Sequence, residues 1–143
     1  MSTIPLIVIC NNNSGGSFKF VKDIITTYYT QSSQNVSIVK NKQEWTAAIS
    51  KHTHRVVKPI VILQYFMFTD LCTTDIVSAF DTKSFRLIIP IHDWYWFCSR
   101  HHKLYDVEVH RKYLTDITIS KESKALFNIA ERLICPSVFL YER

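Results

Sequence analysis

Apolar residues along the chain fall into five short, almost continuous runs, and between these runs they recur at helical spacing. The runs cover residues 3–10, 36–39, 60–66, 85–91 and 133–135. Short runs rich in Val and Ile predict β-strands. Because these runs are apolar at successive positions, and so on both faces, they predict a sheet that is covered on both sides.

Four helices are predicted between the strands: from about residue 17, from Asn41, over 73–81 and over 120–132. The second opens with Asn41 and has Glu44 three residues later, which is the pattern of a capping box. Their apolar faces are formed by Phe18, Val21, Ile25 and Tyr28 in the first helix, Trp45, Ala48 and Ile49 in the second, Ile76, Val77 and Phe80 in the third, and Leu126, Ile129, Ala130 and Leu133 in the last.

Strands that alternate with helices build βαβ units. The fold class predicted for this chain is therefore α/β: a Rossmann-like, doubly wound, mainly parallel sheet of five or more strands with helices on both faces. Parallel strands joined by right-handed crossovers bring all the loops that follow strands to one edge of the sheet. Ligands of open α/β sheets bind at that edge.

Composition places the chain among soluble single-domain proteins. It has 143 residues, of which 47% are hydrophobic and 13% aromatic, enough for one compact core. Neither a membrane-spanning run nor a signal peptide is recognisable. The four cysteines (Cys10, Cys72, Cys98 and Cys135) form no CxxC pair. We therefore expect reduced thiols and a cytoplasmic location.

The formal net charge of +5 suits an anionic partner. The basic residues are scattered, however, and no basic block alternates with aromatic residues. Solvated surface charge explains this pattern best, and no nucleic-acid partner is expected.

The only two glycines stand side by side, Gly15 and Gly16, between the first predicted strand and the first predicted helix. A strand, a glycine turn and a helix can bring backbone N–H groups to an anion. The alternative is a turn that requires positive φ and binds no ligand. The segment lacks the three spaced glycines of a dinucleotide fingerprint and the Gly-Lys-Ser/Thr of a P-loop.

A second candidate for chemistry follows the fourth strand, where His92 and Asp93 precede an aromatic run, Trp94 to Phe97. A histidine at the carboxyl end of a parallel strand can act as acid or base, or it can be bonded to a nearby carbonyl. The aromatic run can stack on sugars or bases, dip into a membrane interface, or pack as a lid.

Cys98, His101, His102 and His110 invite a metal-site interpretation. Zinc would require four ligands at defined spacing, and Cys-x-x-His without a second pair does not supply it. We expect a surface loop and no metal.

Four patches of this sequence resemble the N-terminal domain of GT-B-fold glycosyltransferases of the family-four, group-one-like type. The patches are NNNSGGSFKFVKDI (11–24), LIIPIHDWYWFCSR (87–100), HRKYL (110–114) and AERLICPSVFLYER (130–143). The family has a Gly-Gly loop that opens the first helix, a His-Asp-aromatic motif after a middle strand, and a Pro-Ser pair after a late strand. Most of the chain is spanned by the likeness.

The resemblance implies a transferase, of the retaining kind, that moves a sugar from a nucleotide-sugar donor to a glycan, lipid or protein acceptor. It implies that Gly15 and Gly16 bind the donor phosphates and that His92 is the catalytic residue beside the transferred sugar. The acceptor-binding residues implied are Asp93, Trp94, Tyr95, Trp96 and Ser137. No metal and no cofactor other than the co-substrate is implied.

The resemblance also implies that residues 1–143 are the acceptor-side half of a longer enzyme. The donor-gripping C-terminal domain and its acidic motif have no counterpart in this sequence, so the fragment alone is expected to be inactive. A helix predicted to begin after Ser137 supports the same expectation. The alternatives are a non-catalytic phosphate- or nucleotide-binding module and a protein-interaction domain that docks through the aromatic run. A peripheral membrane contact also stays open.

Overall fold

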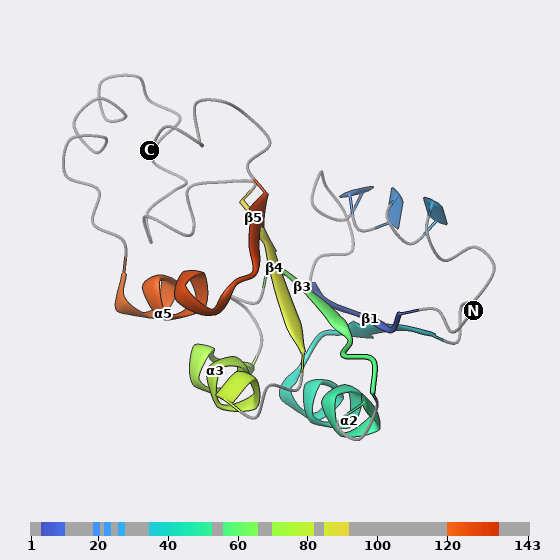
Figure 1. Cartoon of the computed structure of the whole chain (residues 1–143), viewed down its shortest axis with the longest axis horizontal. Helices are drawn as coiled ribbons and strands as arrows, with labels where there is room; N and C mark the ends of the chain where they lie inside the picture. The colour runs from blue at the N-terminus through green and yellow to red at the C-terminus, as the bar shows by residue number, and fades with distance from the viewer. Residues whose placement is uncertain are drawn as a thin grey trace.

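A computed structural model describes residues 4–10, 19–20, 22–23, 26–27, 35–52, 56–65, 70–81, 85–91 and 120–134. Within this part of the chain, five strands form one sheet in the order β2-β1-β3-β4-β5 (Figure 1). The strands are β1 (Leu6–Cys10), β2 (Val36–Val39), β3 (Ile60–Tyr65), β4 (Arg86–Pro90) and β5 (Arg132–Ile134). Every neighbouring pair is parallel. The predicted fold class, a doubly wound α/β sheet, is confirmed.

The strand order contains one reversal. β1 lies between β2 and β3, so the chain first winds outward to β2 and then crosses back past β1 to β3. This order is one of the two common doubly wound arrangements, and the reversal creates a switch point between β1 and β3.

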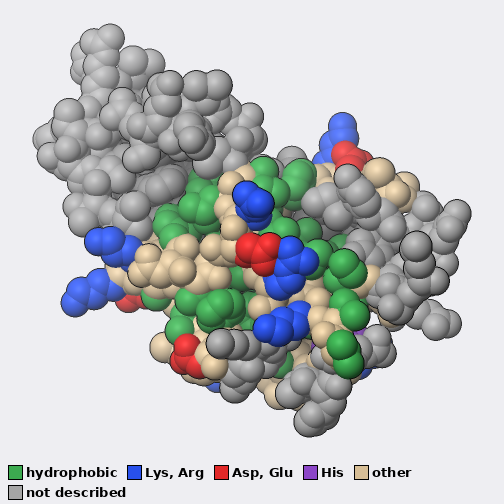
Figure 2. All heavy atoms as spheres, in the orientation of Figure 1, with side chains coloured by type: hydrophobic (Ala, Val, Ile, Leu, Met, Phe, Trp, Pro, Cys, Tyr) green, Lys and Arg blue, Asp and Glu red, His purple; other side chains and the backbone are tan. Residues whose placement is uncertain are grey.

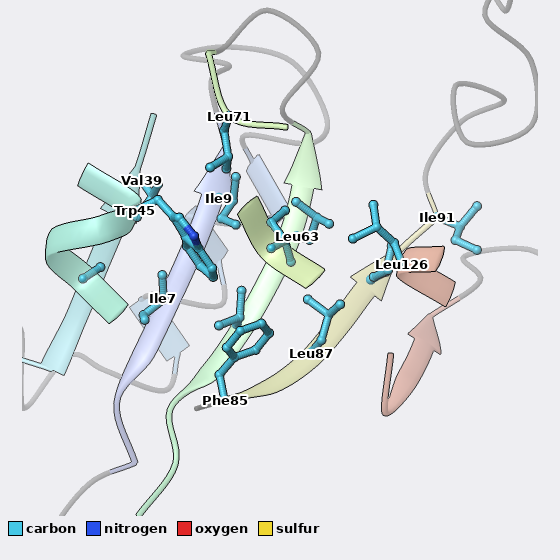
Figure 3. Packing of buried hydrophobic residues seen from close by; sticks show 14 residues of the cluster. Ile7, Ile9, Val39, Trp45, Leu63, Leu71, Phe85, Leu87, Ile91 and Leu126 are labelled. Atoms are coloured by element: carbon cyan, nitrogen blue, oxygen red, sulfur yellow. The ribbon is translucent and has the colours of Figure 1, made fainter. Parts of the chain in front are cut away.

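Three helices pack on one face of the sheet: α2 (Lys42–His52), α3 (Thr73–Asp81) and α5 (Lys121–Ile129) (Figure 1). Alternate strand residues such as Ile7, Leu63 and Leu87 point into this layer and are fully buried (Figure 3). The apolar spacing predicted for α2 places Trp45 and Ala48 in the same core. Trp45 meets Phe85 edge-to-face, with ring centroids 5.5 Å apart.

The other face of the sheet carries a smaller cluster. Leu6, Val8, Cys10 and Ile62 are buried there, and Phe20 packs against them. Phe20 belongs to a stretch in which Lys19, Phe20, Lys22, Asp23, Thr26 and Thr27 are helical. The sheet therefore has helical structure on both faces, as its two-sided apolar strands require.

Two predicted boundaries were wrong. The last helix ends at Ile129 and not at Arg132, because Ala130 is extended and Glu131 N–H already bonds to the Leu87 carbonyl at 2.8 Å. Leu133 accordingly pairs with Ile89 in β5 and is not on the helix. The first strand begins at Leu6, after Pro5, whose nitrogen has no hydrogen to donate to a neighbouring strand.

The second, third and fourth strands begin or end within one residue of their predicted limits. In the part of the chain that the structure describes, no helix is long and apolar enough to cross a membrane.

Candidate functional site at the carboxyl edge of the sheet

The parallel strands bring their carboxyl ends to a single edge, where β1 ends at Cys10, β3 at Tyr65 and β4 at Pro90. In open α/β sheets, ligands bind beyond this edge at the switch point. The switch point of this sheet lies between β1 and β3 (Figure 1). A ligand site of this fold class is expected there.

The register between β1 and β3 breaks at the switch point itself. Ile9 pairs with Leu63, but Cys10 pairs with Tyr65, so Gln64 is the additional residue of a β-bulge. Bulges bend a strand and redirect its side chains, and they are common next to active sites. Gln64 is buried, being only 3% exposed, near the end of the central strand.

All the site residues predicted from the sequence lie outside the described part of the chain. They are Gly15, Gly16, His92, Asp93, Trp94, Tyr95, Trp96 and Ser137, and the rejected metal candidates Cys98, His101, His102 and His110 lie outside it as well. The strands that precede them are described. β1, β4 and β5 end at the carboxyl edge, and β4 and β5 stay paired as far as Ile91, whose N–H donates to the Ile134 carbonyl at 2.8 Å.

A group of polar side chains at this edge was not predicted from the sequence. We call Lys42, Asp70, Cys72, Thr74 and Asp75 the edge cluster. The Lys42 backbone N–H donates to Asp70 Oδ1 at 2.7 Å, and Lys42 Nζ lies 2.8 Å from Asp75 Oδ1. These contacts fasten the beginning of α2 to the segment in which α3 begins.

Asp75 is the centre of the edge cluster. Its Oδ2 accepts hydrogen bonds from the Cys72 backbone N–H at 3.0 Å and from Cys72 Sγ at 2.9 Å. The Cys72 thiol also lies 2.9 Å from Thr74 Oγ1. Hydrogen bonds from the thiol, from Lys42 and from the Cys72 backbone, in that order, lower the pKa of Asp75 from 3.8 to about 2. The carboxylate in turn raises the pKa of Lys42.

The beginning of α2 is capped within its own segment. Asn41 Oδ1 accepts the Glu44 N–H at 2.8 Å, and Glu44 Oε2 accepts the Lys40 N–H at 2.6 Å. The capping pattern predicted at Asn41 is therefore confirmed, with Lys40 in place of Asn41 as the backbone donor. At α5, Ser120 Oγ accepts the Ser123 N–H at 3.1 Å.

The groups that cap a helix also determine whether an anion can bind at its N-terminus. Each of the three described helices α2, α3 and α5 has an acidic residue in its first turn: Glu44, Asp75 and Glu122. A carboxylate at a helix N-terminus satisfies the orphan N–H groups and repels a second anion. The edge cluster therefore joins α2 to the beginning of α3, and it is a poor phosphate site.

The edge cluster also does not form a metal centre. Among the described residues, no group of three or more His, Cys, Asp and Glu side chains could hold a metal ion. The contact between Cys72 and Asp75 could have been predicted from the sequence, because these residues have the spacing of a capping box, with cysteine in the place of the usual N-cap residue. The ion pair between Lys42 and Asp75 could not have been predicted in this way, because the two residues are far apart in sequence and meet only where α2 packs beside α3.

No family model, no curated protein and no solved structure matches this chain. The fold and the carboxyl edge therefore define the class of the protein, a doubly wound α/β domain.

Proposed function

We propose that this chain is the N-terminal, acceptor-side domain of a GT-B-fold glycosyltransferase. The enzyme would transfer a sugar from a nucleotide-sugar donor to an acceptor. Two facts support this proposal. The doubly wound sheet has the architecture that such a domain requires, and the sequence carries the four patches in the expected order.

The observation that carries the proposal is the distribution of carboxylates at the carboxyl edge. The beginnings of α2, α3 and α5 are all occupied by acidic residues or by capping side chains. The segment that follows β1 differs, because residues 11–22 contain Lys19 and Lys22 but no Asp or Glu. The first acidic residue of this segment, Asp23, comes after both lysines, and the segment follows the strand at the switch point.

In the proposed site, backbone N–H groups of Gly15 and Gly16 bind the donor pyrophosphate as it becomes the leaving group. Such donors stabilise developing negative charge without a metal ion. His92 contacts the transferred sugar and acts as the catalytic residue. Asp93, Trp94, Tyr95, Trp96 and Ser137 shape the acceptor site, and a second domain, absent from this sequence, grips the nucleotide.

The anion site can be tested by titrating the chain with inorganic pyrophosphate and following backbone amide resonances by NMR. We expect the largest shifts at Gly15 and Gly16. Ser17→Asp places a carboxylate beside the glycines, and it should weaken pyrophosphate binding about tenfold or more, because like charges repel at close range.

Asn128→Asp is the matched control, since it adds the same charge on the exposed side of α5. It should leave the affinity within about twofold of wild type, because a distant surface charge is screened. The proposal fails if pyrophosphate shifts the first turns of α2, α3 or α5 instead, or if the two variants lose affinity equally.

A further inference from the structure

The amino edge of the sheet, opposite the candidate site, carries an exposed apolar patch. Val56 is 100% exposed, Val57 40% and Ile4 38%, and all three precede strands of the sheet. Ile4 lies near the chain that leads into β3, because the Ile60 N–H donates to the Pro5 carbonyl at 2.9 Å. Half of the exposed large hydrophobic residues in the described chain are thus gathered at one edge.

Two exposed lysines flank the valines along the chain. Lys58 follows Val57 directly and is exposed, and Lys51 is exposed in the last turn of α2. The Arg86 backbone N–H donates to the Pro59 carbonyl at 2.9 Å, which places the beginning of β4 beside Lys58. Figure 2 shows Lys and Arg side chains beside apolar ones on the lower half of the visible face, where α2 and the chain entering β3 lie in Figure 1.

Acidic residues contribute little to this edge. The sequence from Trp45 to Thr69 contains no Asp or Glu. The carboxylate of Glu131 is neutralised by the Arg86 guanidinium, whose Nε lies 2.7 Å from Glu131 Oε2. Asp81 is a further acidic residue at this edge, because α3 ends there. The patch is therefore both apolar and net positive.

We propose that Ile4, Lys51, Val56, Val57 and Lys58 form a contact site for an anionic lipid surface. A protruding pair of valines can enter the headgroup region, and the flanking lysines are attracted to acidic headgroups. The lysines on either side of the valine pair, and the lack of Asp or Glu from Trp45 to Thr69, favour an acidic surface as the occupant. An anionic bilayer is such a surface, and its headgroup region also takes up apolar side chains. The site lies at the edge opposite the proposed transferase site and does not depend on it.

Vesicle flotation of the full chain tests this proposal. We expect binding to phosphatidylcholine vesicles that contain about one third phosphatidylserine, no binding to phosphatidylcholine alone, and loss of binding as salt rises. The double variant Lys51→Glu/Lys58→Glu should weaken binding about tenfold or more. Val56→Ser/Val57→Ser should weaken it severalfold without changing the salt dependence.

Lys121→Glu/Lys124→Glu is the matched control, because these exposed residues lie at the beginning of α5 and give the same change in net charge. It should bind almost as well as wild type, and thermal unfolding should show that every variant is folded at the temperature of the flotation assay. The proposal is overturned if acidic vesicles do not bind at low salt, or if the control loses as much affinity as the lysine variant at the patch. Equal binding to soluble polyglutamate, unaffected by the valine changes, would overturn it in favour of an acidic polypeptide partner.

Discussion

At the residue scale, Asp75 shows how one side chain can connect two helices. It accepts the Cys72 N–H and thiol and pairs with Lys42 at the beginning of α2. The Asp75 side chain is 17% exposed, while the Lys42 side chain is 54% exposed. The hydrogen bonds from Cys72 should therefore contribute more to stability than the ion pair, which water screens.

Asp75→Asn should lower the free energy of unfolding at neutral pH by about 1–2 kcal/mol, less than the full linkage value because Lys42 is exposed. The folded-state pKa of Asp75 lies below its ordinary value of 3.8, at about 2. The stabilisation is thus present above pH 3.8 and is lost as the pH falls toward 2. Urea unfolding between pH 7 and pH 2 should show wild type approaching the variant at the acidic end.

Asp81→Asn is a suitable control, because Asp81 is exposed at the other end of the same helix. Its stability should stay near wild type or rise slightly, since a negative charge at a helix C-terminus is unfavourable. A constant difference in stability between wild type and Asp75→Asn down to pH 2 would contradict the role assigned to the carboxylate.

At the element scale, local signals predicted the helices well where a cap lies next to the helix in sequence. The third helix was predicted over 73–81 and is observed over Thr73–Asp81. The second begins after Asn41, whose side chain caps it as predicted. Val- and Ile-rich runs likewise located β2 and β3. In β3 the reason is burial on both faces of the sheet, which leaves few other residue types available, whereas in the edge strand β2 only Val39 is buried.

The junction between α5 and β5 could not be predicted in the same way. The helical spacing of Leu126 and Ile129 continues to Leu133, so the sequence alone favours a longer helix. Pairing with β4 decides the outcome, through Leu133 beside Ile89 and the bond from the Glu131 N–H to the Leu87 carbonyl. Tertiary pairing overrides local propensity at this point.

The Ser120 cap offers a test at this scale. Ser120→Ala removes the acceptor for the Ser123 N–H and the partner of the buried Ser123 hydroxyl. We expect a loss of about 1–2 kcal/mol in the free energy of unfolding, measured by urea denaturation. Ser120→Asp keeps an acceptor and should retain most of the stability. Equal losses in the two variants would show that the cap is unimportant.

At the scale of the whole molecule, the two edges of the sheet differ in character. The strands that precede the predicted site residues in sequence end at the carboxyl edge, and the amino edge carries the apolar and basic patch. The sequence was sufficient to predict the parallel sheet and its helical layers. It could not predict the edge cluster, because Lys42 meets Asp75 only through the packing of α2 beside α3.

If the acceptor and the nucleotide are bound by two different domains, as we propose, residues 1–143 alone should transfer no sugar. One domain alone can neither exclude water from the active site nor hold the donor and the acceptor in the orientation that the reaction requires. An assay of the purified chain with a panel of nucleotide sugars and simple acceptors should show no turnover above the background without protein. Robust turnover would contradict the assignment of this chain to one half of an enzyme.

The central claim is that this domain binds the phosphates of a nucleotide sugar while another domain binds the nucleoside. The most direct measurement compares the dissociation constants of inorganic pyrophosphate and of a panel of nucleoside diphosphates for the chain, by NMR titration. The account predicts weak binding of all of them at Gly15 and Gly16, with affinities within about tenfold of one another. A nucleoside diphosphate that binds about a hundredfold more tightly than pyrophosphate would contradict it, and would identify the chain as a nucleotide-binding module in its own right.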